Sequence, residues 1–125
     1  MMDDRSEGLL AWQWNLYPDN HRARRNLLLH GVSVPLFHLG NVLLVTAPFT
    51  SLWMVLPGAL FTVGALALEG RGHRLEAASP VPFRGPFDAL VRLFVEQWVT
   101  FPRFVLSGGF ARAWRATREA PLTQP

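Results

Sequence analysis

The side chains of this sequence best suited to bind a transition metal are its four histidines, His21, His30, His38 and His73. Imidazole is the commonest metal-binding side chain in proteins and suits iron, zinc and copper. The sequence has no cysteine, which excludes thiolate metal sites, thiol nucleophiles and disulfides. A transition-metal site in this chain must therefore be built from histidine and carboxylate groups.

The spacing of the first two histidines sets a condition on a shared site. His21 and His30 are nine positions apart, which at ~100° per residue puts them on opposite faces of one straight helix. If both bind one metal, the helix must be interrupted between them, within residues 22–25. Asn26 and His30 are four positions apart and face the same way on a helix, so Asn26 is a candidate ligand or hydrogen-bond partner.

Two further residues near the histidines have alternative roles. Glu76 follows His73 by three positions and would share its face on a helix, where it could be a fourth ligand or an acceptor that orients an imidazole. His38 stands in the middle of an apolar segment, and for this histidine we favour helix packing through one hydrogen bond over metal binding. The sequence has neither a phosphate-binding glycine loop nor a His-x-x-His-His or His-x-x-x-His box.

The elements that must position these residues begin with an apolar segment, residues 26–68, which contains no Asp, Glu, Lys or Arg. This length is about twice the ~20 residues that a helix needs to cross ~30 Å of hydrocarbon. The polar, proline-containing stretch 46–51 is typical of a turn. We therefore predict an all-α integral membrane protein with a helical hairpin, whose two spans cover residues 27–47 and 52–68.

Arginines on both sides of the apolar segment predict its orientation. Arg22, Arg24 and Arg25 precede it, Arg71 and Arg74 follow it, and the connecting turn has no charge. Both termini are thus expected in the cytoplasm, with His21, His30 and His73 at the cytoplasmic mouth of the hairpin. All twelve basic residues are arginine, which suggests a GC-rich bacterial source and hence the inner membrane. Because the basic residues flank the membrane segments, we expect no nucleic-acid partner.

The remaining segments are expected to lie at the membrane surface within one domain of residues 1–125. Residues 6–16 predict an interfacial helix, 77–86 an extended loop with three prolines, and 87–119 amphipathic helices. Trp53 and Trp98 are interpreted as interface anchors. Arg92 and Glu96 are interpreted as an ion pair on a solvated helix face, since they stand four positions apart.

The spacing around the histidines resembles that of a known family. The pattern is Tyr17-x3-His21-x4-Asn26-x3-His30-x4-Pro35, followed after the apolar segment by Gly72-His73 and then by Glu76 and Pro80. It is similar to the small membrane proteins typified by the fungal 2-hydroxy fatty acid dioxygenase of phytosphingosine α-oxidation. The resemblance implies an Fe(II) enzyme that uses O₂ to shorten a 2-hydroxy fatty acid by one carbon. It also implies His21, His30 and His73 as iron ligands, with Asn26 and Glu76 in support.

Two classes of function therefore remain open from the sequence. The first is an Fe²⁺-dependent membrane dioxygenase, an oxidoreductase of fatty acid metabolism with a membrane lipid or fatty acid as substrate. The second is a non-enzymatic membrane hairpin, either a partner-binding anchor or a small oligomeric pore. A zinc site at the same histidines is not distinguished from iron, because histidine-rich sites bind both metals. The sequence makes no prediction of the oligomeric state.

Overall fold

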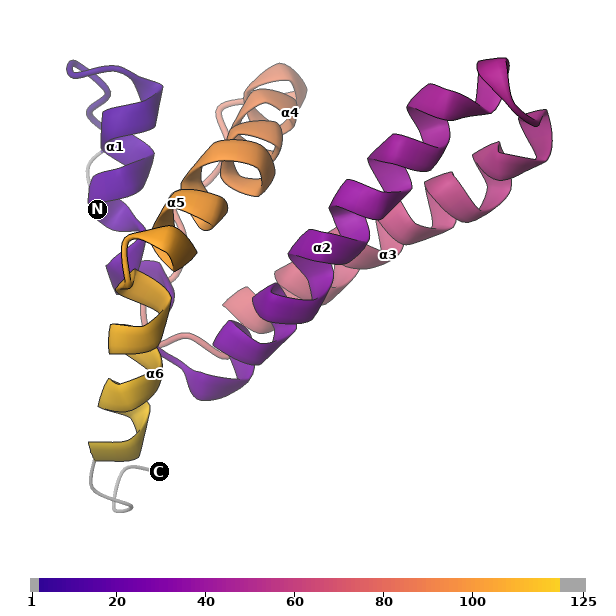
Figure 1. Ribbon diagram of the computed structural model, residues 1–125. Helices are drawn as coiled ribbons and strands as arrows, with labels where there is room; N and C mark the ends of the chain where they lie inside the picture. Colours follow the sequence, from indigo (N-terminus) through magenta and orange to yellow (C-terminus); the bar gives the residue numbers. More distant parts are fainter. Residues whose placement is uncertain (1–2, 120–125) are drawn as a thin grey trace.

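The computed structural model describes residues 3–119, and over that range the chain is helical with no strand (Figure 1). The prediction of an all-helical protein is confirmed. The α-helices are α1 (Leu9–Leu16), α2 (Arg24–Thr46), α3 (Val55–His73), α4 (Pro86–Val95), α5 (Phe101–Leu106) and α6 (Gly109–Glu119).

Helices α2 and α3 are the two longest elements and pack side by side (Figure 1). They are joined by two short 3-10 turns, η2 (Ala47–Phe49) and η3 (Leu52–Met54). The segments Arg24–Phe49 and Leu52–His73 are each long and apolar enough to cross a membrane. Their backbones touch at Gly40, where an added Cβ would lie 2.7 Å from the backbone nitrogen of Thr62 and 2.8 Å from the carbonyl oxygen of Gly58. Only glycine permits this approach.

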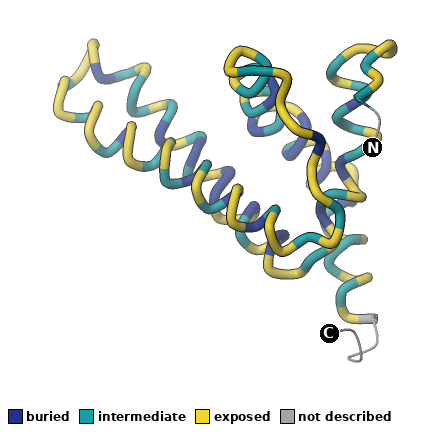
Figure 2. Tube along the Cα trace, turned by 180° about the vertical axis from the view of Figure 1, so that it is seen from behind, coloured by how far each residue is buried: buried dark blue, intermediate teal, exposed yellow. Residues whose placement is uncertain are grey.

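The outer surfaces of this helix pair are apolar and largely uncovered (Figure 2). Val45 and Leu60, one on each helix, are 70% and 69% exposed. A soluble protein rarely leaves so large an apolar surface in water. Burial increases along the pair toward the end that carries the N-terminus of α2 and the C-terminus of α3, where the other helices gather (Figure 2).

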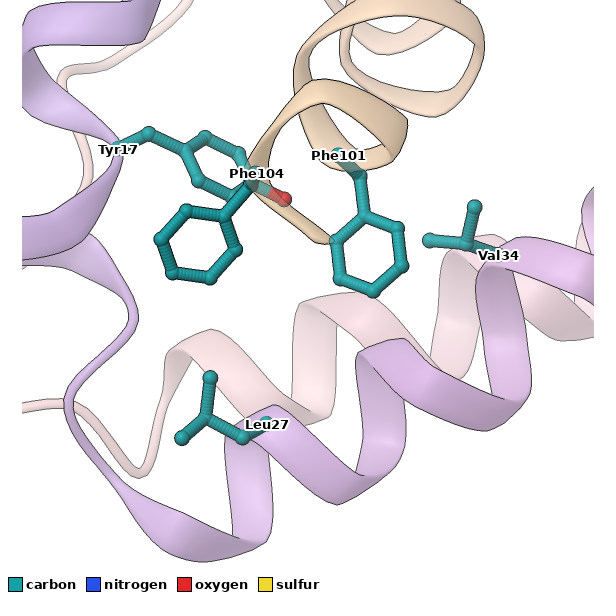
Figure 3. Close-up of a cluster of buried hydrophobic side chains, with 5 residues drawn as sticks. All are labelled: Tyr17, Leu27, Val34, Phe101 and Phe104. Atoms are coloured by element: carbon teal, nitrogen blue, oxygen red, sulfur yellow. The ribbon is translucent and has the colours of Figure 1, made fainter. Parts of the chain in front are cut away.

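The remaining helices meet the pair at that end through a small apolar core (Figure 3). This core consists of Tyr17, Leu27, Val34, Phe101 and Phe104, which come from the end of α1, from α2 and from α5. Phe110 and Trp114 of α6 pack around it. The core therefore fixes α1, α5 and α6 against the first turns of α2.

Two irregular segments interrupt the helices at this junction. The 3-10 turn η1 (Pro18–Asn20) ends before His21, and Ala23 has extended backbone angles, so α2 starts only at Arg24. This is the interruption that a shared site for His21 and His30 requires. The second segment, η4 (Glu96–Thr100), is a π-helical turn between α4 and α5. Such turns insert a residue into a helix and occur frequently at functional sites.

Helix α4 has its polar face inward, contrary to the prediction. Phe87 and Leu90 on its apolar face are 78% and 55% exposed, whereas Arg92 is buried. The predicted ion pair of Arg92 with Glu96 on a solvated face is wrong. Arg92 instead lies 3.7 Å from a carboxylate oxygen of Asp88 and donates hydrogen bonds to the carbonyl groups of Val81 and Pro82. Spacing along the helix predicted which residues share a face, but tertiary packing decided which way that face turns.

Candidate metal centre

His21 is held in one tautomer by the turn that precedes it. Its Nδ1 donates a hydrogen bond of 2.8 Å to the carbonyl oxygen of Tyr17, and its ring stacks on the Tyr17 ring at a centroid distance of 3.8 Å. The side chain is buried. Because the proton is on Nδ1, the lone pair of Nε2 is free and points away from the turn.

His30 is oriented in the same manner by α2. Its Nδ1 donates to the carbonyl oxygen of Asn26, one helical turn earlier, over 3.1 Å. Its Nε2 therefore faces the same space as Nε2 of His21. The two Nε2 atoms lie 3.2 Å apart, and Nε2 of His30 also lies 3.3 Å from Oε1 of Glu96. Either a proton on Nε2 of His30 or a metal cation between the groups would stabilise this arrangement.

Glu96 and His73 complete the group. The Oε1 atom of Glu96 lies 3.3 Å from Nε2 of His30 and 3.7 Å from Nε2 of His21, and it accepts a hydrogen bond from the Tyr17 hydroxyl over 3.2 Å. The His73 ring lies 5.0 Å from each of the other two imidazole rings. Its Nδ1 is buried and has no hydrogen-bond partner among the described residues. One donor atom from each of the four side chains lies within 4.8 Å of the other three.

The protonation states suit a metal. Burial, together with the neighbouring imidazoles, lowers the pKa of His21 to about 3, so this histidine is neutral near pH 7. Burial would raise the pKa of Glu96, but the hydrogen bond from His30 and the nearby histidines outweigh it and lower that pKa to about 2. A neutral imidazole and an ionised carboxylate are the forms of these groups that bind a cation.

The spacing of some donors fits one ion. Two ligands at ~2.1 Å from one metal are about 3.0 to 3.4 Å apart in octahedral or tetrahedral geometry. The separations from Nε2 of His30 to Nε2 of His21 and to Oε1 of Glu96 are 3.2 and 3.3 Å, whereas Nε2 of His21 and Oε1 of Glu96 are 3.7 Å apart and would have to approach each other slightly. A group of three histidines and one glutamate is thus able to hold a metal ion, and its donor types accept iron, zinc or copper alike.

Asn26 and Glu76 lie beside this group but not within it. The carboxylate of Glu76 accepts hydrogen bonds from the backbone N–H groups of Arg22 and Ala23 and from the Asn26 side chain at 2.8 Å. It therefore caps the N-terminus of α2, where the helix dipole favours an anion. Glu76 accepts no hydrogen bond from a histidine, and the contact of Asn26 with the group is its backbone carbonyl on His30. Both residues support the frame of the site.

Comparisons with known proteins add no assignment to this geometry. Neither the protein-family models, nor the curated proteins, nor the solved structures give a match to this chain. The functional argument therefore rests on the arrangement of the residues themselves.

Glu96 is the member of the group that the sequence did not indicate. It lies 20 residues after Glu76, in a segment with no histidine. Asp88, Arg92 and Glu96 follow each other at intervals of four residues, a spacing that is common for ion pairs on exposed helix faces. The signal that singles it out is structural, because it is the first residue of the π-helical turn η4. That turn is held to α2 by His38, whose Nε2 donates to the carbonyl oxygen of Gln97 over 2.6 Å.

His38 itself lies outside the metal-binding group, as the packing interpretation predicted. Besides its hydrogen bond to Gln97, its ring stacks on Trp98 at a centroid distance of 4.1 Å. Trp98 thus packs on a histidine and is also partly exposed, and Trp53 at the far end of the helix pair is 79% exposed.

A cavity of about 460 Å³ opens next to the group. His21, His73 and Glu96 contribute to one part of its wall. The rest is mostly apolar and comes from α1, α3, α4 and the loop between α3 and α4, with lining side chains that include Trp12, Leu16, Leu66, Val81, Phe83 and Leu93. Arg74 also lines the cavity and makes no ion pair with a described residue. A small amphipathic molecule in this cavity would contact its apolar walls, the Arg74 guanidinium and the histidine–glutamate group.

Proposed function

We propose that this protein is an Fe²⁺-dependent membrane dioxygenase that acts on a 2-hydroxy fatty acid or a related lipid. The observation that carries the proposal is the convergence of His21, His30, His73 and Glu96, with the Nε2 atoms of two buried imidazoles 3.2 Å apart. The resemblance of the histidine spacing to the fungal 2-hydroxy fatty acid dioxygenases supplies the reaction class. We assign the ligand role to the three histidines and Glu96, and the supporting role to Asn26 and Glu76.

The membrane location is part of the proposal. Two segments of sufficient length and apolarity, their uncovered outer surfaces and the outward apolar face of α4 support it. The arginines next to both segments support a cytoplasmic position for both termini, in the inner membrane of a bacterium. The metal-binding group is then at the cytoplasmic mouth of the helix pair, at the depth of lipid headgroups and carboxylates.

Different residues of the site would hold the metal ion, the substrate carboxylate and the acyl chain. A ferrous ion, when bound, would supply O₂ activation and a position for a hydroxy-carboxylate. The histidines and Glu96 would hold that ion; His21 and His30 are buried, while His73 and Glu96 face the cavity. Arg74 can pair with the substrate carboxylate, while the apolar walls of the cavity accept the first part of the acyl chain. The uncovered apolar helix surfaces offer a path for the remainder of the chain.

Metal analysis of the detergent-purified protein tests the proposal. We expect about one iron per chain after anaerobic purification, a loss of most of it in His73→Ala, and its retention in Thr46→Ala. The second variant is the control, since Thr46 is a polar residue at the far end of α2 whose hydroxyl bonds only to its own helix. The iron-loaded protein is then incubated with 2-hydroxy fatty acids, and products one carbon shorter are measured by mass spectrometry.

Three results would contradict the proposal in different ways. The absence of metal from wild type, even after reconstitution with Fe²⁺, would leave a non-enzymatic membrane protein, either an anchor or a pore. Tight binding of zinc without turnover would indicate a structural site. Equal loss of iron in His73→Ala and Thr46→Ala would show that the variants act by unfolding the protein.

A further inference from the structure

A second buried carboxylate lies next to the metal-binding group without belonging to it. Glu69 is on α3, one helical turn before His73, and is 3% exposed. It lines the same cavity as His73 and Glu96. Its oxygens accept hydrogen bonds from Ser33 over 3.0 Å and from Gln97 over 2.5 Å. Both donors are uncharged.

Glu69 has no charged partner. It makes no ion pair with any arginine or histidine of the described residues, whereas Oε1 of Glu96 lies within 3.7 Å of Nε2 of His21 and of His30. Glu69 is thus held by uncharged hydrogen-bond donors alone. What it contributes to the site is the position of the segments that it joins.

The hydrogen bonds of Glu69 also connect the segments that carry the ligands. Ser33 is on α2, three residues after His30, and Gln97 follows Glu96 directly in η4. Glu69 itself shares α3 with His73. One carboxylate therefore joins α2, α3 and η4 at the level where each of them presents a donor atom.

We propose that Glu69 is a positioning residue of the metal centre, which aligns α2, α3 and η4 so that their donor atoms converge on one ion. The proposal rests on the metal site of the proposed function but needs neither its substrate nor its reaction. Glu69 acts from outside the ligand set, because its two oxygens are engaged by Ser33 and Gln97. Residues that hold ligands in this way typically contribute 10- to 100-fold to metal affinity.

The test is a titration of the metal-free, full-length protein in detergent with Co²⁺ at pH 8, followed by the visible absorption of the bound ion. We compare wild type with Glu69→Gln, which removes the charge and keeps the size of the side chain. We expect the Co²⁺ affinity to fall by about 10- to 100-fold, with the absorption bands at unchanged wavelengths. Thr62→Val is the matched control, because it alters a polar residue of α3 away from the site, and it should leave the affinity unchanged.

Thermal unfolding of the same samples gives a second readout. The rise in Tm on addition of Co²⁺ should be smaller in Glu69→Gln than in wild type, because stabilisation by a bound ion depends on its affinity. A residue with a merely structural role would lower the Tm equally with and without Co²⁺.

Several outcomes overturn the proposal. An unchanged Co²⁺ affinity in Glu69→Gln would remove any role in metal binding, and shifted absorption bands would show that Glu69 is itself a ligand. A rise in Tm on addition of Co²⁺ that is as large in Glu69→Gln as in wild type would contradict the positioning role. If wild type binds no Co²⁺, the proposed metal site fails and this inference with it, whereas binding that is equal in wild type and Glu69→Gln leaves the proposed function intact.

Discussion

Gly72→Ala is expected to separate the two long helices at the metal centre. Gly72 precedes His73 and faces the buried side chain of Asn26. An added Cβ would lie 2.2 Å from Oδ1 of Asn26 and 3.2 Å from its Cγ. Asn26 has no room to rotate without cost, because its Nδ2 donates to Glu76 and to the carbonyl oxygen of Asn20.

The magnitude follows from this distance. Ordinary contact between two heavy atoms begins near 3.4 Å, so the helices must move apart by about 1 Å at this point. Overpacking of this kind typically costs ~1 to 3 kcal/mol of stability. Alanine is better than glycine inside a helix by up to ~1 kcal/mol, which offsets part of the cost. The net loss is therefore about 1 to 2 kcal/mol.

The same displacement affects the metal site more than the fold. Asn26 orients His30 through its carbonyl group, so a shift of about 1 Å moves His30 relative to His73. Metal–ligand distances tolerate only about ±0.2 Å. We expect Gly72→Ala to lose most of its bound metal while it remains helical. Circular dichroism during heating reports the stability, and elemental analysis reports the metal.

Gly64→Ala is the matched control for this experiment. Gly64 is on the same helix, and an added Cβ there has no neighbour within 4 Å. This variant should keep its metal and unfold at the same or a slightly higher temperature. The reasoning is refuted if Gly72→Ala binds metal as wild type does, or if the two variants behave alike.

Three further predictions concern the carboxylates and the pH. Glu96→Gln should lower metal affinity at least about tenfold, with a smaller loss in Tyr17→Phe, which removes only the hydroxyl contact; metal titration measures both. Glu76→Gln should cost about 1 kcal/mol in thermal unfolding through the weakened cap of α2, whereas the exposed Glu7→Gln should cost nothing. The metal-free protein should lose stability as the pH falls from about 6.5 toward 3. Burial lowers the pKa of His21 to about 3 in the folded protein, so in this pH range the unfolded chain takes up a proton at His21 that the folded chain does not. His21→Gln should flatten this pH dependence of the Tm.

Much of the fold could be predicted from the sequence because long apolar segments leave few alternatives. A charge-free stretch of this length specifies two helices, and the position of histidines at its two ends brings them to one side of the pair. The interruption between His21 and His30 followed from the angular spacing of a helix, and the structure has it at residues 21–23.

The orientation of α4 and the burial of Glu69 depend on packing between distant segments, which a sequence pattern does not show. The sequence pattern of α4 is compatible with either a solvated or a buried charged face. The exposed apolar face of that helix shows that the charged face turns inward. Glu69 stands at the end of an apolar segment, where a charged residue usually marks the membrane interface. Its burial results from contact with Ser33 and Gln97, which lie far from it in the sequence.

The four side chains of the candidate metal centre are spread over residues 21–96, and this spread imposes an order on biosynthesis. His21, His30 and His73 leave the ribosome before Glu96, which is in the turn after α4. The nascent chain therefore presents three histidines without their carboxylate until η4 packs against α2. A metal can be held by all four groups only after that packing.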